Sequence, residues 1–298
     1  FECMSLLGIA VGKEKFLPDA REAIQEMMKT TLESDNVQRE YIKEASERIC
    51  QCLKKDFAPF LQGGLLEGIF RNLTLVNEPT PAPGKEDDED DIIEVSTGDG
   101  KTVRVRTQKF EEMTQSVQLL STFCTVMEGA YFDFVPATAK ALLPLLTATN
   151  DYEEVRGTTL LTWGLLIKCA AQGAQERSLP NSIARELLST GLQNTVHLLD
   201  SSKEAELLAE TATGITECIK NGGAGILSGE ETTQLVAKMF TLIDQSFVRT
   251  GKLLKEKQDE KTAATSLPKE LGEEDDDDEN YELEEEDQLR RNYEEVLG

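Results

Sequence analysis

Prolines that begin helical patterns recur at regular intervals along the chain. Pro18, Pro59, Pro136 and Pro180 are separated by 41, 77 and 44 residues. Proline is favoured in the first turn of a helix because its missing N–H needs no partner there. The long interval contains a segment of different composition, residues 75–108, and removing these 34 residues reduces 77 to 43. This period predicts stacked repeats rather than a fold around one central core.

Apolar residues recur three and four positions apart between these prolines, as in Leu142, Leu145 and Leu146. One pair of such helices cannot bury both faces, but a stack of pairs can. The fold predicted is all-α, a right-handed superhelical solenoid of HEAT type with two helices per repeat. The predicted helices span residues 1–11, 18–33, 38–55, 58–73, 109–129, 132–148, 152–173, 180–199, 202–221 and 229–261.

The segment 75–108 has an internal order of its own. Pro79–Pro83 is a stiff linker, and an acidic run follows it: Glu86, Asp87, Asp88, Glu89, Asp90 and Asp91. Ile92–Arg106 then alternates around Ser96–Lys101, which has the residue types of a tight turn. Alternation around such a turn predicts a β-hairpin, so the solenoid is expected to carry a short acidic insertion with this hairpin.

A second acidic segment follows the last long helix. Residues 262–280 include Asp275, Asp276, Asp277 and Asp278 and are predicted to be a disordered loop. The predicted organisation is therefore repeats over 1–74, the first of them partly truncated, the insertion over 75–108, and repeats over 109–261. The acidic loop over 262–280 and the first helix of a further repeat over 281–298 complete it.

The net charge of −25 is concentrated in two short segments. Glu86–Asp91 contribute −6, and residues 273–298 carry 14 acidic residues against two arginines. This balance argues against binding to duplex nucleic acid, which needs clustered Lys and Arg. It favours a basic protein partner, or solubility alone. Because the chain has no run of 18 apolar residues, no membrane span is expected either.

The chain has few residues that could perform catalysis or hold a metal. Its six cysteines form no C-x-x-C pair, and there is one histidine, His197. Neither a zinc framework nor a Cys/His catalytic pair is expected, so the chain is predicted to be a non-enzyme without cofactors or metals. The cysteines are interpreted as free thiols in a reducing compartment. Four of them occupy the same place, late in a first helix, where small buried thiols pack between helices: Cys50, Cys124, Cys169 and Cys218.

Two other features have structural interpretations. Trp163, among four leucines, is expected in the core. Gly222–Gly225 lacks a preceding strand and a following Lys-Ser or Lys-Thr, and is therefore expected to be a turn between helices rather than a phosphate cradle.

The first sixteen residues, Phe1–Phe16, are very similar to a middle-to-late stretch of karyopherins of the importin beta-3 type, in the importin-beta superfamily. Lys54–Phe57, the acidic insertion and Glu153–Gly157 follow in the order expected for that family. Asp151 and Arg156 resemble the Asp and Arg that HEAT repeats use as a structural ladder. A HEAT scaffold for a signalling or phosphatase complex is the alternative, although that class should lack an acidic insertion with a hairpin.

The resemblance implies a monomeric nuclear import receptor that shuttles between cytoplasm and nucleus. Such a receptor binds basic nuclear localisation signals on its concave second-helix face and phenylalanine-glycine nucleoporins on its convex face. It releases cargo to the GTP form of Ran, but the family's principal Ran contact lies in amino-terminal repeats that this sequence lacks. Ran binding is therefore not expected of this part alone.

One stripe of carboxylates is a candidate cargo site. Asp19, Glu22 and Glu26 lie at positions i, i+3 and i+7 of a predicted second helix, which places them on one face. If that face lines the concavity, it would receive Lys or Arg of a cargo. An ordinary solvated helix face is the competing interpretation. The two acidic runs would steer basic cargo, or act as solvated spacers.

Overall fold

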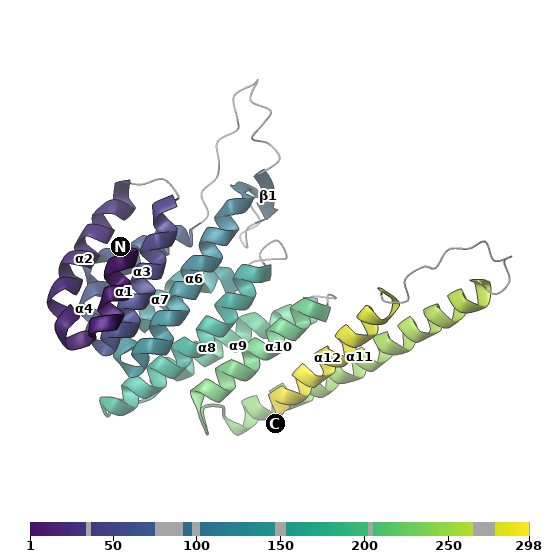
Figure 1. The fold of residues 1–298 in the computed structure, drawn as a ribbon. Coiled ribbons are helices and arrows are strands. Elements are labelled where there is room, and N and C mark those ends of the chain that lie inside the picture. Colours follow the sequence, from purple (N-terminus) through teal and green to yellow (C-terminus); the bar gives the residue numbers. More distant parts are fainter. Residues whose placement is uncertain are drawn as a thin grey trace, which may run out of the picture.

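The computed structural model describes residues 1–33, 37–74, 92–96, 102–146, 153–201, 205–264 and 278–297. Over these ranges the chain forms pairs of antiparallel helices packed side by side (Figure 1). The helices are α1 (Glu2–Val11), α2 (Lys13–Glu33), α3 (Val37–Leu53), α4 (Ala58–Phe60), α5 (Leu66–Asn72), α6 (Thr107–Met127), α7 (Val135–Leu146), α8 (Glu153–Glu176), α9 (Ser182–Ser201), α10 (Ala205–Gly222), α11 (Gly229–Ala264) and α12 (Asp278–Leu297).

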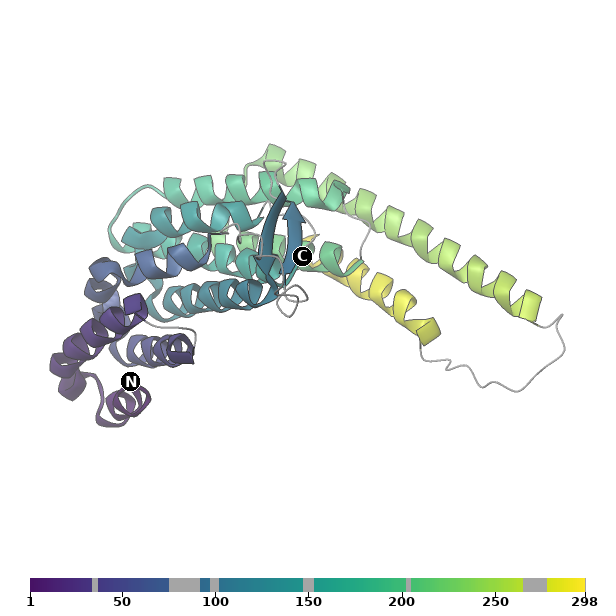
Figure 2. The same ribbon diagram turned by 90° about the horizontal axis from the view of Figure 1, so that it is seen from above.

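The helices form two layers. Each first helix of a pair contacts the next along the stack, in the order α1, α3, α6, α8, α10 and α12. The second helices are α2, α4 with α5, α7, α9 and α11. The stack is open and curved, and α11 extends well beyond the other helices (Figure 2). The predicted α-helical repeat solenoid is thus confirmed. Among the described helices, none combines the length and apolar composition that a membrane span requires.

The core follows the stack as a band of apolar side chains between the two layers. Its larger part begins at Phe16 and continues as far as Ile226. A second part lies between α10, α11 and α12 and includes Leu208, Met239 and Leu289.

The four cysteines with a shared place in the repeat are all buried. All six cysteines are free thiols, as predicted. Burial raises the pKa of Cys50 and of Cys218 to about 12, and the Cys169 thiol donates to the Cys124 carbonyl at 3.3 Å. Protonated thiols that bond to the backbone are structural, because the reactive form of cysteine is the thiolate.

Trp163 lies in the core, as predicted. Its side chain is 1% exposed, and its Nε1 donates to the carbonyl of Leu187 in α9 at 2.9 Å. The ring is close to the backbone of Gly191, where a Cβ would lie 2.8 Å from Nε1. Trp163 therefore joins α8 to α9 through both packing and a hydrogen bond. Arg156 is fully buried near the start of α8, whereas Asp151 lies outside the described residues.

A residue in the left-handed region ends or follows each first helix from α1 to α10. These residues are Gly12, Lys54, Glu128, Ser178 and Gly223, with φ values of 80°, 51°, 50°, 53° and 80°. Residues with a Cβ are strained there and glycine is not. A positive φ thus recurs after these helices although the residue type changes, while Gly12 has an extended ψ of 164°. Gly223 and Gly225 both have positive φ, and the predicted turn at Gly222–Gly225 is confirmed.

Replacing Gly223 by alanine should test the cost of this turn. A Cβ at Gly223 would meet no atom within 4 Å, so only the backbone conformation penalises the change. We expect the free energy of unfolding to fall by about 1–2 kcal/mol. The matched control is Gly229→Ala, which also meets no atom within 4 Å but begins α11, where alanine is tolerated. Equal effects of the two changes in chemical denaturation would contradict this explanation.

Several predicted helices differ from the structure in where they begin, and α9 begins at Ser182 rather than at Pro180. The helix expected over 58–73 is interrupted, because Gly64 has φ 106° and separates α4 from α5 across the irregular turn Leu61–Leu65. The helix expected to begin at Pro18 begins at Lys13, so Pro18 lies in its second turn rather than its first. Pro59, by contrast, lies in the first turn of α4 as predicted.

Two strands lie between α5 and α6. The strands β1 (Ile92–Ser96) and β2 (Thr102–Arg106) pair antiparallel, with Ile93 opposite Val105. The predicted linker and the acidic run Glu86–Asp91 lie outside the described residues, as does the turn between the strands. The helix after the insertion, α6, begins at Thr107.

Both ends of the predicted acidic loop over 262–280 are helical in the structure. The helix α11 continues to Ala264, and α12 begins at Asp278. Asp275, Asp276 and Asp277 lie outside the described residues. At the start of α11 the Ser228 hydroxyl accepts from the Glu231 N–H, and the Glu231 carboxylate accepts from the Ser228 N–H. This capping box lowers the pKa of Glu231 and fixes where α11 begins.

Candidate interaction surfaces

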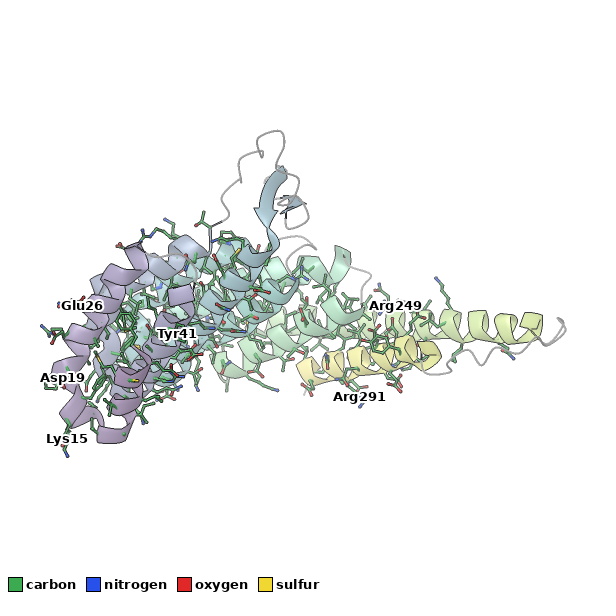
Figure 3. All side chains as sticks on the ribbon, turned by 45° about the horizontal axis from the view of Figure 1, so that its top comes forward. Lys15, Asp19, Glu26, Tyr41, Arg249 and Arg291 are labelled. Atoms are coloured by element: carbon green, nitrogen blue, oxygen red, sulfur yellow. The ribbon has the colours of Figure 1, made fainter. Side chains whose placement is uncertain are left out.

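The carboxylates of the predicted stripe share one exposed face of α2. This helix packs on α1 and α3 through the opposite face, where Phe16, Ala20, Ala23, Ile24 and Met27 are buried. Asp19, Glu22 and Glu26 are exposed, and Figure 3 shows Asp19 and Glu26 at the outer edge of the molecule. The carboxylates lie away from the buried face because apolar and acidic residues alternate along α2 with the period of a helix.

The charge of this stripe is not purely negative. Lys15 is exposed four residues before Asp19 and lies close to it along the same side of α2 (Figure 3). In the described part of the chain, no ion pair is formed by Asp19 or Glu22. Asp19 and Glu22 are therefore able to receive basic side chains. Each exposed ion pair contributes about 0.2–1 kcal/mol, so three carboxylates alone give a weak site.

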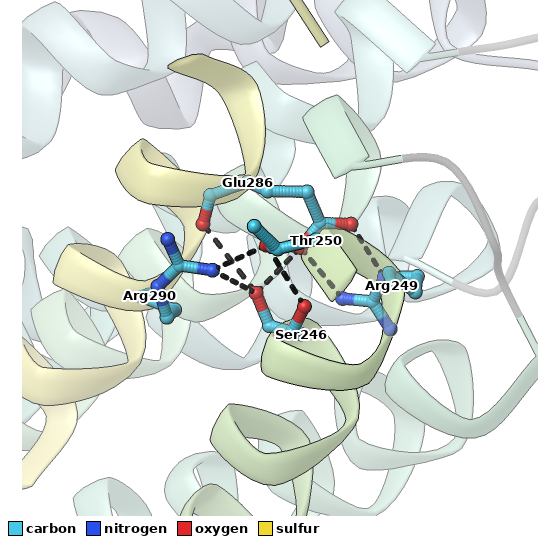
Figure 4. Close-up of polar contacts among 5 residues, drawn as sticks. All are labelled: Ser246, Arg249, Thr250, Glu286 and Arg290. Carbon is cyan, nitrogen blue, oxygen red and sulfur yellow. Dashed lines mark hydrogen bonds and ion pairs between the residues drawn. The ribbon is translucent and has the colours of Figure 1, made fainter. Parts of the chain in front are cut away.

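A buried polar cluster joins the two helices that flank the second acidic segment (Figure 4). Glu286 of α12 is 5% exposed. Its carboxylate accepts from Arg249 of α11 through Nε at 2.5 Å and Nη2 at 3.2 Å. The Ser246 hydroxyl donates to the same carboxylate at 2.5 Å. The carboxylate therefore has three hydrogen-bond donors from one neighbouring helix, which is the arrangement that compensates for burying a charge.

Arg290 closes the cluster from the other side. Its Nη1 donates to Ser246 Oγ at 3.1 Å and to Thr250 Oγ1 at 2.7 Å, and its guanidinium lies 4.6 Å from the centre of the Phe247 ring. One turn further along α12, burial raises the pKa of Tyr293 to about 12. Ser246 is fully buried between charged partners, so the cluster fastens α12 to α11.

A pocket that the sequence did not predict lies between α3, α5 and α6. Its volume is about 270 Å³, and its lining includes Gly64 and Gly68 of the interrupted second helix. The closely spaced glycines were visible in the sequence, but only the contact between three helices that are far apart in the chain defines a cavity. His197 lies in α9, and its side chain is outside the described part. Over the described residues, no group of His, Cys, Asp and Glu could hold a metal ion.

The chain is similar in sequence to a karyopherin. It is 27% identical over 190 residues to importin subunit beta-3 of Saccharomyces cerevisiae, which covers 60% of this chain and 17% of the yeast protein. The chain thus spans about one sixth of the length of that relative. No family model matches it.

The fold is that of solved karyopherin structures. The crystal structure of Kap121p superposes with a TM-score of 0.69 at 17% identity, over 99% of this chain and 26% of Kap121p. Kap121p bound to Nup53p gives a TM-score of 0.67 at 19% identity, over 99% of this chain and 26% of that protein.

An open stack of helix pairs that matches these structures over nearly its whole length has the HEAT-repeat solenoid fold seen in Kap121p. The sequence relative is an importin beta-3 and the structural neighbours are structures of the karyopherin Kap121p, so the chain is similar to importin-beta karyopherins in both sequence and fold. The relatives are transport receptors rather than enzymes.

Proposed function

We propose that this chain is part of a nuclear import receptor that binds protein cargo with basic localisation signals. The main observation in support of this proposal is the acidic stripe of α2, which is exposed on a second helix of a karyopherin-like stack. Kap121p, a structural neighbour, has been solved in complex with Pho4p, with Ste12p and with the SUMO protease Ulp1p. Binding of several different proteins by the same type of solenoid supports a cargo-binding role here.

Other partners are proposed for the whole receptor. A Kap121p complex with Nup53p supports a nucleoporin partner, and shuttling through the nuclear pore would follow from that interaction. Release of cargo by the GTP form of Ran is proposed for the full-length receptor, in which the repeats with the family's principal Ran contact are present.

The acidic runs would act before docking. Six exposed ion pairs at about 0.5 kcal/mol each supply roughly 3 kcal/mol, whereas micromolar affinity needs about 8 kcal/mol. Long-range attraction raises the rate of encounter without holding the docked partner. The runs at 86–91 and 275–278 are therefore proposed to steer basic cargo towards the second-helix layer.

Binding kinetics can separate docking from steering. With a Lys/Arg-rich cargo peptide, charge reversal at Asp19, Glu22 and Glu26 should raise the dissociation rate severalfold, because the docked cations would face like charge. Neutralising Glu86–Asp91 should slow association and flatten its salt dependence while dissociation stays nearly unchanged. Stopped-flow measurements at two ionic strengths give both rates.

The matched control for the stripe is charge reversal at Glu186 and Glu230. Both are exposed, Glu186 in the second turn of α9 and Glu230 in the first turn of α11, far along the stack from α2. They should leave both rates unchanged. If reversal of the stripe also changes neither rate, cargo is bound outside these repeats and the assignment of α2 is wrong.

A further inference from the structure

Large apolar side chains lie exposed in a row along one side of α11. Phe240, Phe247 and Leu254 have exposed fractions of 57%, 59% and 52%. They are spaced seven residues apart, so they return to the same side of the helix. Another side of α11 contributes to the core that it shares with α12. An exposed apolar row on a helix that extends beyond the rest of the stack (Figure 2) is typical of a surface that binds another protein.

A gap lies beside this apolar row. Gly251 follows Val248 by three residues and Phe247 by four, so it is their neighbour on the helix surface. A Cβ built on Gly251 meets no atom within 4 Å. Glycine weakens the interior of a helix, but it allows another chain to approach the backbone closely. Val248 is 60% exposed, so the helix presents a projecting side chain next to an open position.

Two opposite charges flank this pair of residues. Asp244 lies four residues before Val248, and Lys255 lies four residues after Gly251. Both are exposed, and neither forms an ion pair among the described residues. The order acid, projecting side chain, gap, base is complementary to its own reverse. A second identical helix that runs antiparallel would therefore place an acid against a base and a side chain against a gap.

We propose that α11 binds α11 of a second copy of this chain in an antiparallel pair related by a twofold axis. Val248 of each copy enters the gap at Gly251 of the other copy. Asp244 of each copy faces Lys255 of the other, so the two ion pairs set the register. A parallel pair would instead place like charges against each other. The apolar rows of the two copies then meet along one edge of the interface.

The dimer should be in equilibrium with the monomer. Stable complexes bury roughly 1,200–2,000 Å² in total, and a contact of one helix from each copy lies at the low end of that range. The proposal differs from the monomer that the family resemblance implies. It does not depend on the binding of basic cargo, because α2 and α11 lie at opposite ends of the stack (Figure 1).

Analytical ultracentrifugation of the whole chain over a range of concentrations tests the dimer. We expect monomer and dimer without larger species, because a twofold interface closes on itself. Phe240→Asp should raise the dissociation constant at least tenfold, since it places a charge in the apolar row. Gly251→Gln should do so by filling the gap, and loss of folding cannot explain its effect because glutamine favours a helix. Leu161→Asp, at an exposed leucine of α8, is the matched control and should dimerise normally.

A charge exchange tests the antiparallel register. At low ionic strength, Asp244→Lys alone or Lys255→Asp alone should raise the dissociation constant severalfold, and the double variant should restore it. In a parallel pair the double variant would still bring like charges together, so failure to restore the dimer would overturn the register. A dimer indifferent to Phe240→Asp and Gly251→Gln would place the contact elsewhere and overturn the proposal. A chain that is monomeric at every concentration would leave the apolar row to a different partner and overturn it as well.

Discussion

Replacing Trp163 by alanine is expected to lower the free energy of unfolding by about 3–5 kcal/mol. Trp163 is the largest fully buried side chain among the described residues, and its removal leaves a cavity between α8 and α9. The change also leaves the Leu187 carbonyl without its donor in the interior. Chemical denaturation followed by circular dichroism measures the loss, and hydrogen exchange should show faster opening of α8 and α9.

The control for this change lies in the same helix. Leu161 is 46% exposed, two residues before Trp163. Leu161→Ala should therefore cost well under the roughly 3 kcal/mol lower bound for Trp163→Ala. Similar losses of stability from both substitutions would show that any truncation in α8 destabilises the protein. The burial of the Trp163 ring would then not explain the effect.

Replacing Glu286 by alanine is expected to cost about 2–3 kcal/mol and to loosen α12. Removing one partner of a buried ion pair typically costs about 3–5 kcal/mol, since the other charge stays desolvated. We expect a smaller loss here because the Arg249 side chain is 30% exposed and is hydrated once Glu286 is removed. Denaturation gives the free energy, and hydrogen exchange in α12 reports the loosening.

Two variants test whether the loss comes from the unpaired charge. Arg249→Met combined with Glu286→Leu should recover part of the stability, because both charges are then absent. Asp287→Ala removes an exposed carboxylate that pairs with Arg290 on the same helix, and it should cost under about 1 kcal/mol. A double variant no more stable than Glu286→Ala would contradict the ion-pair explanation.

Much of the architecture could be predicted because its signals are local. Proline in a first turn and apolar residues at helical spacing are properties of a few neighbouring residues, and they indicated the two-helix period. The shared position of Cys124 and Cys169 indicated which face of each first helix is buried. The exposure of Asp19, Glu22 and Glu26 followed in the same way from helical spacing.

What the sequence did not predict depends on contacts between distant residues or on backbone conformation. The bend at Gly64 needed a φ value that a glycine permits but does not require. The pair of Arg249 and Glu286 joins residues 37 positions apart across a segment without a periodic signal. The pocket on Gly68 depends on the distance between α3 and α6, which helical patterns do not specify. The role of the acidic stripe remains a prediction, because exposure alone does not identify a partner.

The neighbour-to-neighbour order of the first helices has a mechanical consequence. In the described part of the chain, each first helix packs mainly against its immediate neighbours in the row from α1 to α12. No contact between more distant first helices is extensive enough to brace the arc. A small tilt at the junction between two first helices therefore displaces every helix beyond it, and the displacement grows with distance from the junction. The span between α2 and the tip of α11 is set by the sum of these junctions.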